Sequence, residues 1–271
     1  MNEKIKELLK KDRYDFGDLC VVMELLRGEG GCPWDREQTH ESIRQNFIEE
    51  TYEVIEAIDS RDKKLLCEEL GDVLLQVVFH AQMEKEAGCF DMGDVSDGIV
   101  KKLIYRHPHI FGAVQADTAE KVLDNWEALK AREKNRDTVT ASLRAVPKQF
   151  PALMRAQKVG KKAAKAGFDF PDAESAAKKV TEELWEVRTA AGDEARAEEV
   201  GDLLFAAVNT ARKYGVDAER ALGQATDKFI SRFADVEETV LASGKSLSEI
   251  PMEELDALWD VVKLHKNSKN S

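Results

Sequence analysis

The sequence contains little of what marks several large classes of protein. Glycine and proline account for only 16 and 6 of the 271 residues, which excludes collagen-like and low-complexity chains. Basic residues are fewer than acidic ones, 40 against 52, so the net charge is −12, and no sustained basic tract occurs. This balance argues against binding of duplex DNA or RNA. An anionic small molecule would need local Lys and Arg side chains or metal ions.

Long apolar runs are also absent. The amino-terminal residues lack the apolar core of a secretory signal, and no apolar run is long enough to cross a membrane. We therefore expect a cytoplasmic protein without a membrane partner. No CxxC pair and no suitable His spacing occur, so we expect reduced, mostly structural thiols at Cys20, Cys32, Cys67 and Cys89.

Apolar residues recur every three or four positions along nearly the whole chain, which predicts an all-α fold. We expect helices over residues 18–27, 40–59, 63–87, 94–105, 119–134, 151–165, 173–191, 194–214, 218–243 and 252–265. The expected N-caps are Asp18, Thr39, Asp94, Thr118, Asp172 and Asp217, and the glycines expected at helix ends are Gly88, Gly192, Gly215 and Gly244. A polar stretch at 135–150 predicts a linker between domains at 18–134 and 151–265.

The two predicted domains repeat each other. EETYEVIEAI at 49–58 corresponds to EELWEVRTAA at 182–191, and EELGDVLLQVV at 68–78 corresponds to EEVGDLLFAAV at 198–208. Further along, KLIYR at 102–106 parallels KFISR at 228–232, and Trp126 and Trp259 are each followed four residues later by Lys. This ordered series of matches predicts a tandem duplication of a helical bundle, with four to five helices in each half.

Each half carries two pairs of acidic residues at helical spacing, so that each pair shares one helix face. The pairs are Glu50 with Glu53, Glu69 with Asp72, Glu183 with Glu186, and Glu199 with Asp202. The midpoint between the two pairs falls at Ser60–Asp62 in the first half and at Gly192–Asp193 in the second. If each half folds as an antiparallel hairpin, both pairs lie level, about 12 to 14 Å from the turn.

These carboxylates are expected to bind metal ions. Asp72 and Asp202 lie in strongly apolar stretches, and clustered carboxylates carried inward need a cationic partner. Oxygen ligands without Cys or His favour Mg²⁺, with Mn²⁺ as a substitute. Two alternatives stay open. One is a di-iron site, although the paired acids here are spaced as ExxE and ExxD, whereas such proteins use ExxH on two helices. The other is a non-enzymatic helical adaptor or regulatory nucleotide-binding protein with solvated acids.

The EExxE and EExGD motifs resemble those of the all-α nucleoside triphosphate pyrophosphohydrolases. The duplication, together with GCPWDREQT at 31–39, RHPHIF at 106–111 and PALMRAQK at 151–158, resembles the two-domain MazG family from about Leu19 to Lys263. The resemblance implies hydrolysis of a nucleoside triphosphate to the monophosphate and diphosphate, with a broad range of ribo- and deoxyribonucleotide substrates. It also implies a homodimer, Mg²⁺ bound by all eight acids, and a second half that is the main catalyst.

Charge balance predicts more than one metal ion in each site, because four carboxylates and a triphosphate together carry about eight negative charges. In the expected reaction, water attacks the α-phosphorus. We predict that Glu50 and Glu183 orient or deprotonate this water, since each follows a second acid.

Basic and aromatic residues outside the hairpins are candidate substrate ligands. Two pairs, each spaced by four residues, are predicted to bind phosphate: Lys102 with Arg106, and Lys228 with Arg232. The tryptophans of the repeat either stack on the base or anchor their helices: Trp126 and Trp259.

Overall fold

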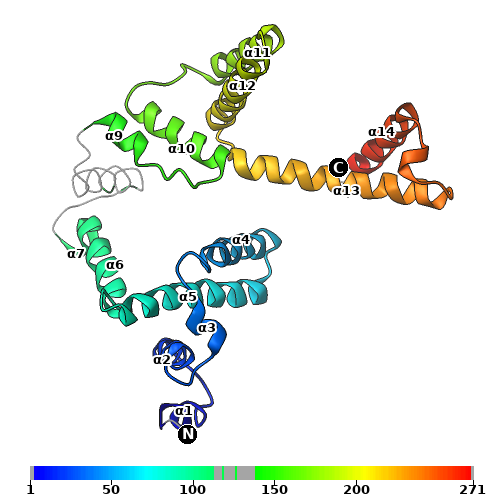
Figure 1. The fold of residues 1–271 in the computed structure, drawn as a ribbon. Coiled ribbons are helices and arrows are strands. Elements are labelled where there is room, and N and C mark those ends of the chain that lie inside the picture. Colours follow the sequence, from blue (N-terminus) through cyan, green and yellow to red (C-terminus); the bar gives the residue numbers. More distant parts are fainter. Residues whose placement is uncertain (1–2, 113–117, 119–125, 127–137, 270–271) are drawn as a thin grey trace. The chain divides into compact units, whose positions relative to one another are not determined.

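The structure is a computed structural model that describes residues 3–112, 118, 126 and 138–269 (Figure 1). Throughout these residues the regular elements are helices and no strand occurs, which confirms the all-α prediction. The helix expected at 119–134 lies outside the described residues except for Trp126, so the expected cap at Thr118 stays a prediction. Within the described part of the chain, no helix combines the length and apolarity that a membrane span requires.

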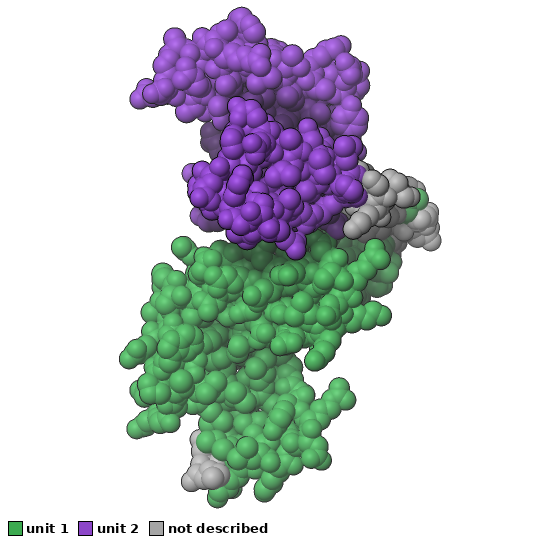
Figure 2. Space-filling model, turned by 90° about the vertical axis from the view of Figure 1, so that its right-hand side faces the viewer, with its two compact units in different colours: residues 1–130 green, residues 131–271 purple. Residues whose placement is uncertain are grey.

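The chain divides into two compact units, residues 1–130 and 131–271 (Figure 2). The helices of unit 1 are α1 (Glu3–Leu8), α2 (Phe16–Arg27), α3 (Pro33–Glu37), α4 (Arg44–Ser60), α5 (Lys63–Glu86), α6 (Met92–Arg106) and α7 (Pro108–Phe111). Those of unit 2 are α9 (Val139–Arg144), α10 (Ala152–Lys165), α11 (Ala173–Thr189), α12 (Asp193–Lys213), α13 (Ala218–Ala242), the short 3₁₀ helix η1 (Leu247–Glu249) and α14 (Met252–Lys269).

The segment expected to be a linker contains a helix. Within residues 135–150, α9 packs against α10, and Lys162 donates a hydrogen bond to the Ser142 hydroxyl at 2.9 Å. Val146 is buried at 3 % exposure. This part of the chain therefore belongs to unit 2, whereas the boundaries of the two domains stay predictions.

A helical hairpin dominates each unit, α4 with α5 and α11 with α12. The first hairpin turns at Arg61, which adopts a left-handed conformation with φ 59°. The Asp62 side chain caps α5 by accepting hydrogen bonds from the backbone amides of Lys64 and Leu65. The second turns at Gly192, where φ is 98° and a residue without a side chain is favoured. Both turns lie where the spacing of the acids predicted them.

Two expected N-caps are wrong by one helical turn. Asp15 caps α2 and Asp91 caps α6, while Asp18 and Asp94 lie three residues further on, where each closes a capping box with the cap residue. The expected cap residues are thus the second members of these boxes. Both positions in a capping box accept a backbone amide, so an Asp-x-x-Asp sequence fits either register.

The helix that carries the first acid pair begins four residues later than expected, at Arg44. Thr39 does not cap it, because the Thr39 hydroxyl accepts the amide of Ser42 at 3.2 Å and closes a separate turn. The expected caps at Asp172 and Asp217 are confirmed for α11 and α13.

The core of unit 1 lies between α2, the second half of α5 and the residue that precedes α4. Its buried members are Met23, Ile43, Val78, Phe79 and Met83. In unit 2, the buried amide of Gln157 joins α10 to the start of α13 by accepting from the Ala218 amide at 2.8 Å and donating to the Val216 carbonyl at 2.9 Å. These contacts fix the hairpins from the side opposite their turns.

Candidate active site

The first hairpin brings the predicted acids of unit 1 together. Carboxylate oxygens of Glu50, Glu69 and Asp72 all lie within 4.8 Å of one another. Burial raises the pKa of Glu50, and the charge of Asp72 and the contact with Glu53 raise it further. Burial and the neighbouring Glu53 likewise raise the pKa of Glu69. The four carboxylates therefore repel one another unless a cation lies between them.

The second hairpin repeats this cluster with Glu183, Glu199 and Asp202, whose oxygens also lie within 4.8 Å of one another. The fourth acid, Glu186, has a raised pKa, mainly because it contacts Glu183. Glu183 is the most buried of the group, at 5 % exposure. The spacing of the acids thus predicted both clusters correctly, although Glu53 and Glu186 lie at their edges.

A lysine distinguishes the second cluster. The ammonium of Lys179 lies 2.8 Å from Oε1 of Glu183 and 2.7 Å from Glu182, and this contact lowers the pKa of Glu183. In the aligned repeat, the position of Lys179 is occupied by Asn46 in the first half. The two clusters therefore have the same acids but differ by one positive charge. Sequence reasoning missed Lys179, although alignment of the two halves beyond their matching motifs would have revealed the difference.

The other oxygen of Glu183 has no partner within the described structure. Oε2 is buried and accepts no hydrogen bond. A buried carboxylate oxygen without a donor is costly unless a cation compensates it. The all-oxygen donor set and this unpartnered oxygen fit a hard divalent cation, which is the metal class expected from the sequence.

A cavity of about 420 Å³ lies beside the second cluster. Lys179, Glu183 and Asp202 form one side of it. The remaining wall is largely apolar and aromatic, with an amide and a guanidinium group, and includes Phe168, Phe170, Phe205, Asn209 and Arg212. Its volume lies within the range of small-molecule binding sites. Two cavities of unit 1, one between α1 and α2 and one beside Lys85, are lined by residues outside its acid cluster.

Ion pairs fix one edge of this cavity. Asp169, in the loop between α10 and α11, binds the guanidinium of Arg212 and the ammonium of Lys213, the latter at 3.2 Å. These hydrogen bonds, chiefly that from Arg212, lower the pKa of Asp169 to about 2. Arg212 also donates from Nε to the Asn209 side-chain oxygen at 3.2 Å. The loop that carries Phe168 is thereby held against the end of α12.

Two of the three predicted substrate ligands of unit 1, Arg106 and Trp126, contact each other. Arg106 is buried at 5 % exposure, and its guanidinium lies over the Trp126 ring, 5.2 Å from the centroid. This distance is typical of a cation–π contact, so the pair anchors the end of α6. Lys102 is half-buried on the same helix.

The corresponding residues of unit 2 are Lys228 and Arg232 on α13 and Trp259 on α14. The Trp259 ring packs against Phe229 with the centroids 5.1 Å apart, which makes it a packing anchor between the two helices. These three residues do not line the cavity beside the acids. Their binding to phosphate or base stays a prediction.

The model of the MazG nucleotide pyrophosphohydrolase domain matches residues 38–111 and 172–236, which contain both hairpins and all eight acids. A nucleoside triphosphate pyrophosphohydrolase/pyrophosphatase MazG of Thermotoga maritima is 44 % identical over 248 residues, or 92 % of this chain and 95 % of the relative. A nucleoside triphosphate pyrophosphohydrolase of Escherichia coli K12 is 43 % identical over 251 residues, which cover 90 % and 95 % of the two chains. The chain therefore belongs to the MazG nucleotide pyrophosphohydrolase family.

Proposed function

We propose that this chain is an Mg²⁺-dependent nucleoside triphosphate pyrophosphohydrolase, which converts a nucleoside triphosphate and water to the monophosphate and diphosphate. The names of relatives that match over nearly their full length support the activity. The observation that carries the proposal is the unpartnered, buried oxygen of Glu183 at the edge of a cavity large enough for a nucleoside. A helical adaptor with solvated acids would need neither feature.

Each acid cluster would hold metal ions, with Glu50, Glu53, Glu69 and Asp72 in unit 1 and Glu183, Glu186, Glu199 and Asp202 in unit 2. When bound, Mg²⁺ neutralises phosphate charge and makes a coordinated water more acidic. Glu183 is the residue that we assign to orienting this water, and Lys179 keeps Glu183 ionised by its contact at 2.8 Å. Lys179 also lines the cavity, from where its ammonium can bind a phosphate oxygen.

The cavity wall suits the nucleoside part of the substrate. Phe168, Phe170 and Phe205 provide aromatic and apolar surface on which a base can stack. Asn209 and Arg212 offer an amide and a guanidinium for hydrogen bonds to the base or sugar. Stacking accepts any base, which is consistent with a broad range of substrates.

The second half is proposed as the main catalyst, because Lys179 and the adjoining cavity belong to it. The domains are proposed at 18–134 and 151–265, each containing one acidic hairpin. We further propose a homodimer, since the outer faces of the hairpins expose large apolar side chains. Among these side chains are Trp185 at 64 % and Leu204 at 53 % in unit 2, and Ile58 at 55 %, Leu70 at 52 % and Tyr52 at 47 % in unit 1.

The test is product analysis with the full chain, Mg²⁺ and each ribo- and deoxyribonucleoside triphosphate in H₂¹⁸O. We expect equal amounts of monophosphate and diphosphate, with ¹⁸O in the monophosphate, because water attacks the α-phosphorus. Asp202→Asn should abolish most of this release and Asp72→Asn should leave most of it. Release of orthophosphate, or ¹⁸O in the diphosphate, would show that the reaction is a different one.

A further inference from the structure

Two histidines close the open end of the first hairpin, away from the acid cluster. His40 precedes α4 and His80 lies on α5, and their Nδ1 atoms are 2.6 Å apart. The ring planes are parallel within 3° and the centroids are 4.9 Å apart. That separation equals the distance between the nitrogens plus the two ring radii, so the rings lie edge to edge, with the two Nδ1 atoms facing each other.

A shared hydrogen explains this distance better than a shared metal ion. Two imidazole nitrogens bound to one zinc at about 2.0 to 2.1 Å each are more than about 3 Å apart. A separation of 2.6 Å instead corresponds to a short N–H···N hydrogen bond. Such a bond needs one ring to donate from Nδ1 and the other to accept. If both rings are protonated, both nitrogens carry a hydrogen and the contact cannot persist.

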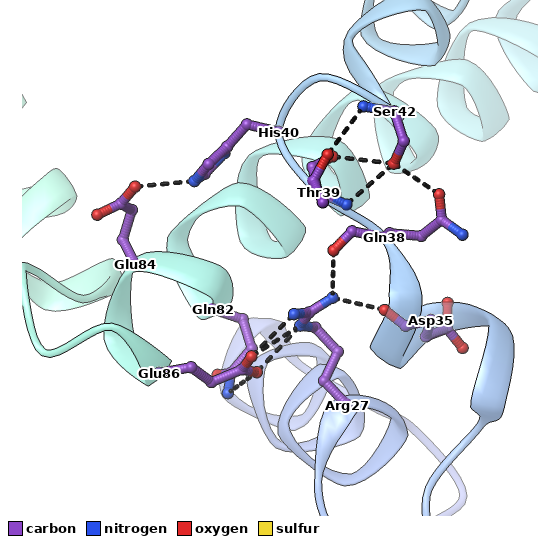
Figure 3. Close-up of polar contacts among 9 residues, drawn as sticks. All are labelled: Arg27, Asp35, Gln38, Thr39, His40, Ser42, Gln82, Glu84 and Glu86. Carbon is purple, nitrogen blue, oxygen red and sulfur yellow. Dashed lines mark hydrogen bonds and ion pairs between the residues drawn. The ribbon is translucent and has the colours of Figure 1, made fainter.

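The surroundings fix the orientation of His40. Its Nε2 lies 2.8 Å from Oε1 of Glu84 (Figure 3). Glu84 lies on α5, four residues after His80. On the other side, the Phe47 ring lies 5.9 Å from the His80 ring. Among the charged groups near the pair, Glu84 contacts His40 directly, and the carboxylate of Glu41 interacts with the charges of His40 and Arg44. Further along α5, Glu86 is held by the guanidinium of Arg27 on α2.

The position of this pair along the hairpin gives it a mechanical role. His40 and His80 are nearly the same number of residues before and after the turn at Arg61, and the acid cluster lies between them and this turn. The turn holds one end of the hairpin, and the histidines hold the other together with the buried side chain of Ile43. Separation of the histidines would therefore loosen the start of α4, which leads to Glu50.

The second hairpin closes its open end with a different chemistry. Asp169 binds Arg212 and Lys213 there, and the positions aligned with the histidines are Ala173 and Thr210. Because the pKa of Asp169 is about 2, these ion pairs persist in mild acid. An imidazole, by contrast, ordinarily takes up a proton near pH 6.5.

We propose that His40 and His80 are positioning residues of the first acid cluster, which share one hydrogen at neutral pH and separate in mild acid while the second hairpin stays closed. The proposal relies on the function proposed above only in giving the first cluster a metal to bind. The histidine contact itself depends on geometry alone and is testable without substrate.

The titration of His80 agrees with this geometry. Burial lowers the pKa of His80, and the neighbouring His40 lowers it further. While the two rings are in contact, His80 therefore takes up a proton less readily than a ring that has separated and is exposed to water. The stability that the pair contributes is present above about pH 6.5 and is lost as the pH falls below it.

Hydrogen exchange of the full chain, measured by mass spectrometry without metal or nucleotide and corrected for intrinsic rates, tests the proposal. Between pH 7.5 and 5.5, exchange of a peptide covering residues 40–48 should rise by up to about tenfold, because the open pair gains a proton that the closed pair refuses. A peptide covering residues 169–176 should not change.

His80→Gln separates titration from packing, since an amide can replace the hydrogen bond but does not titrate. This variant should retain slow exchange at residues 40–48 and lose the pH dependence, His80→Ala should exchange fast at both pH values, and the exposed control His265→Gln should match the unmodified chain. An unchanged peptide 40–48 in the unmodified chain, or an equal acid step in His80→Gln, would overturn the proposal. Diphosphate release measured on the same samples reports on the proposed function separately.

Discussion

Replacement of Glu183 by Gln separates metal binding from folding in the second site. Glu183 is 5 % exposed, with Lys179 on one oxygen and no hydrogen-bond partner on the other. Gln keeps the volume of the side chain and can still accept from Lys179, while the loss of one charge reduces repulsion among the remaining acids. Without metal, we expect the melting temperature to change by less than about 2 °C.

With metal, the variant and the unmodified chain should differ strongly. A divalent ion at a hundred times its dissociation constant stabilises the folded state by about 2.7 kcal/mol. For a unit of about this size, each kcal/mol raises the melting temperature by roughly 2 to 4 °C, so saturating Mg²⁺ should raise it by about 5 to 11 °C. Glu183→Gln should lose most of this rise, and diphosphate release should fall by about a hundredfold or more.

The assay is differential scanning calorimetry with and without Mg²⁺, combined with diphosphate release. Glu50→Gln is the matched control, because it makes the same change at the aligned position of the first site. It should leave the metal response of unit 2 and most of the activity intact. If Glu183→Gln keeps both the Mg²⁺ response and the activity, the assignment of Glu183 to the metal site is wrong.

Three further variants test the surroundings of the site. Lys179→Asn introduces the residue found at the aligned position of the first half. It should lower kcat/KM for diphosphate release by about tenfold or more, because it removes the ion pair with Glu183 and the proposed contact with a phosphate oxygen. Arg212→Ala should raise KM and lower the melting temperature by several degrees, whereas acid alone should not break the pair with Asp169 above about pH 4, since its pKa is about 2. Trp185→Glu should convert the proposed dimer to a monomer in light scattering.

The acidic hairpins were predictable because two local features of the sequence determine them, the spacing of the acids and the position of the turn. Helical spacing places Glu50 with Glu53 on one face, and an antiparallel turn at the midpoint makes the two pairs level. Neither step requires knowledge of the rest of the molecule. The turns at Arg61 and Gly192 confirm that reasoning.

The cavity was not predictable in the same way, because it depends on contacts between distant segments. Asp169 and Arg212 meet across more than forty residues, and no local pattern indicates that they do. Short helices such as α3 and α9 also escaped prediction, since four to six residues are too few to show a periodicity. The burial of Arg106 over Trp126 was likewise not predictable, because it depends on tertiary packing.

The ammonium of Lys179, which contacts only the second acid cluster, leads to a difference in proton release between the two clusters. In the first cluster, burial and neighbouring acids raise the pKa values of Glu50 and Glu69, so these carboxyl groups hold their protons more tightly than isolated ones. In the second, Lys179 lowers the pKa of Glu183 and keeps one ligand ionised before metal binds.

A metal ion binds the deprotonated ligands. The acids with a raised pKa are Glu50 and Glu69 in the first cluster and Glu186 in the second, so we expect uptake by the first site to release more protons. As the pH is lowered, the first site should therefore lose affinity for metal at a higher pH than the second site does. Titration calorimetry with Mn²⁺ at pH 5.5, in two buffers of different ionisation enthalpy, measures this release directly. Asp202→Asn, which leaves the first site intact, should show the larger dependence on buffer, and Asp72→Asn should show the smaller. The reverse order would mean that Lys179 does not control the charge of the second site.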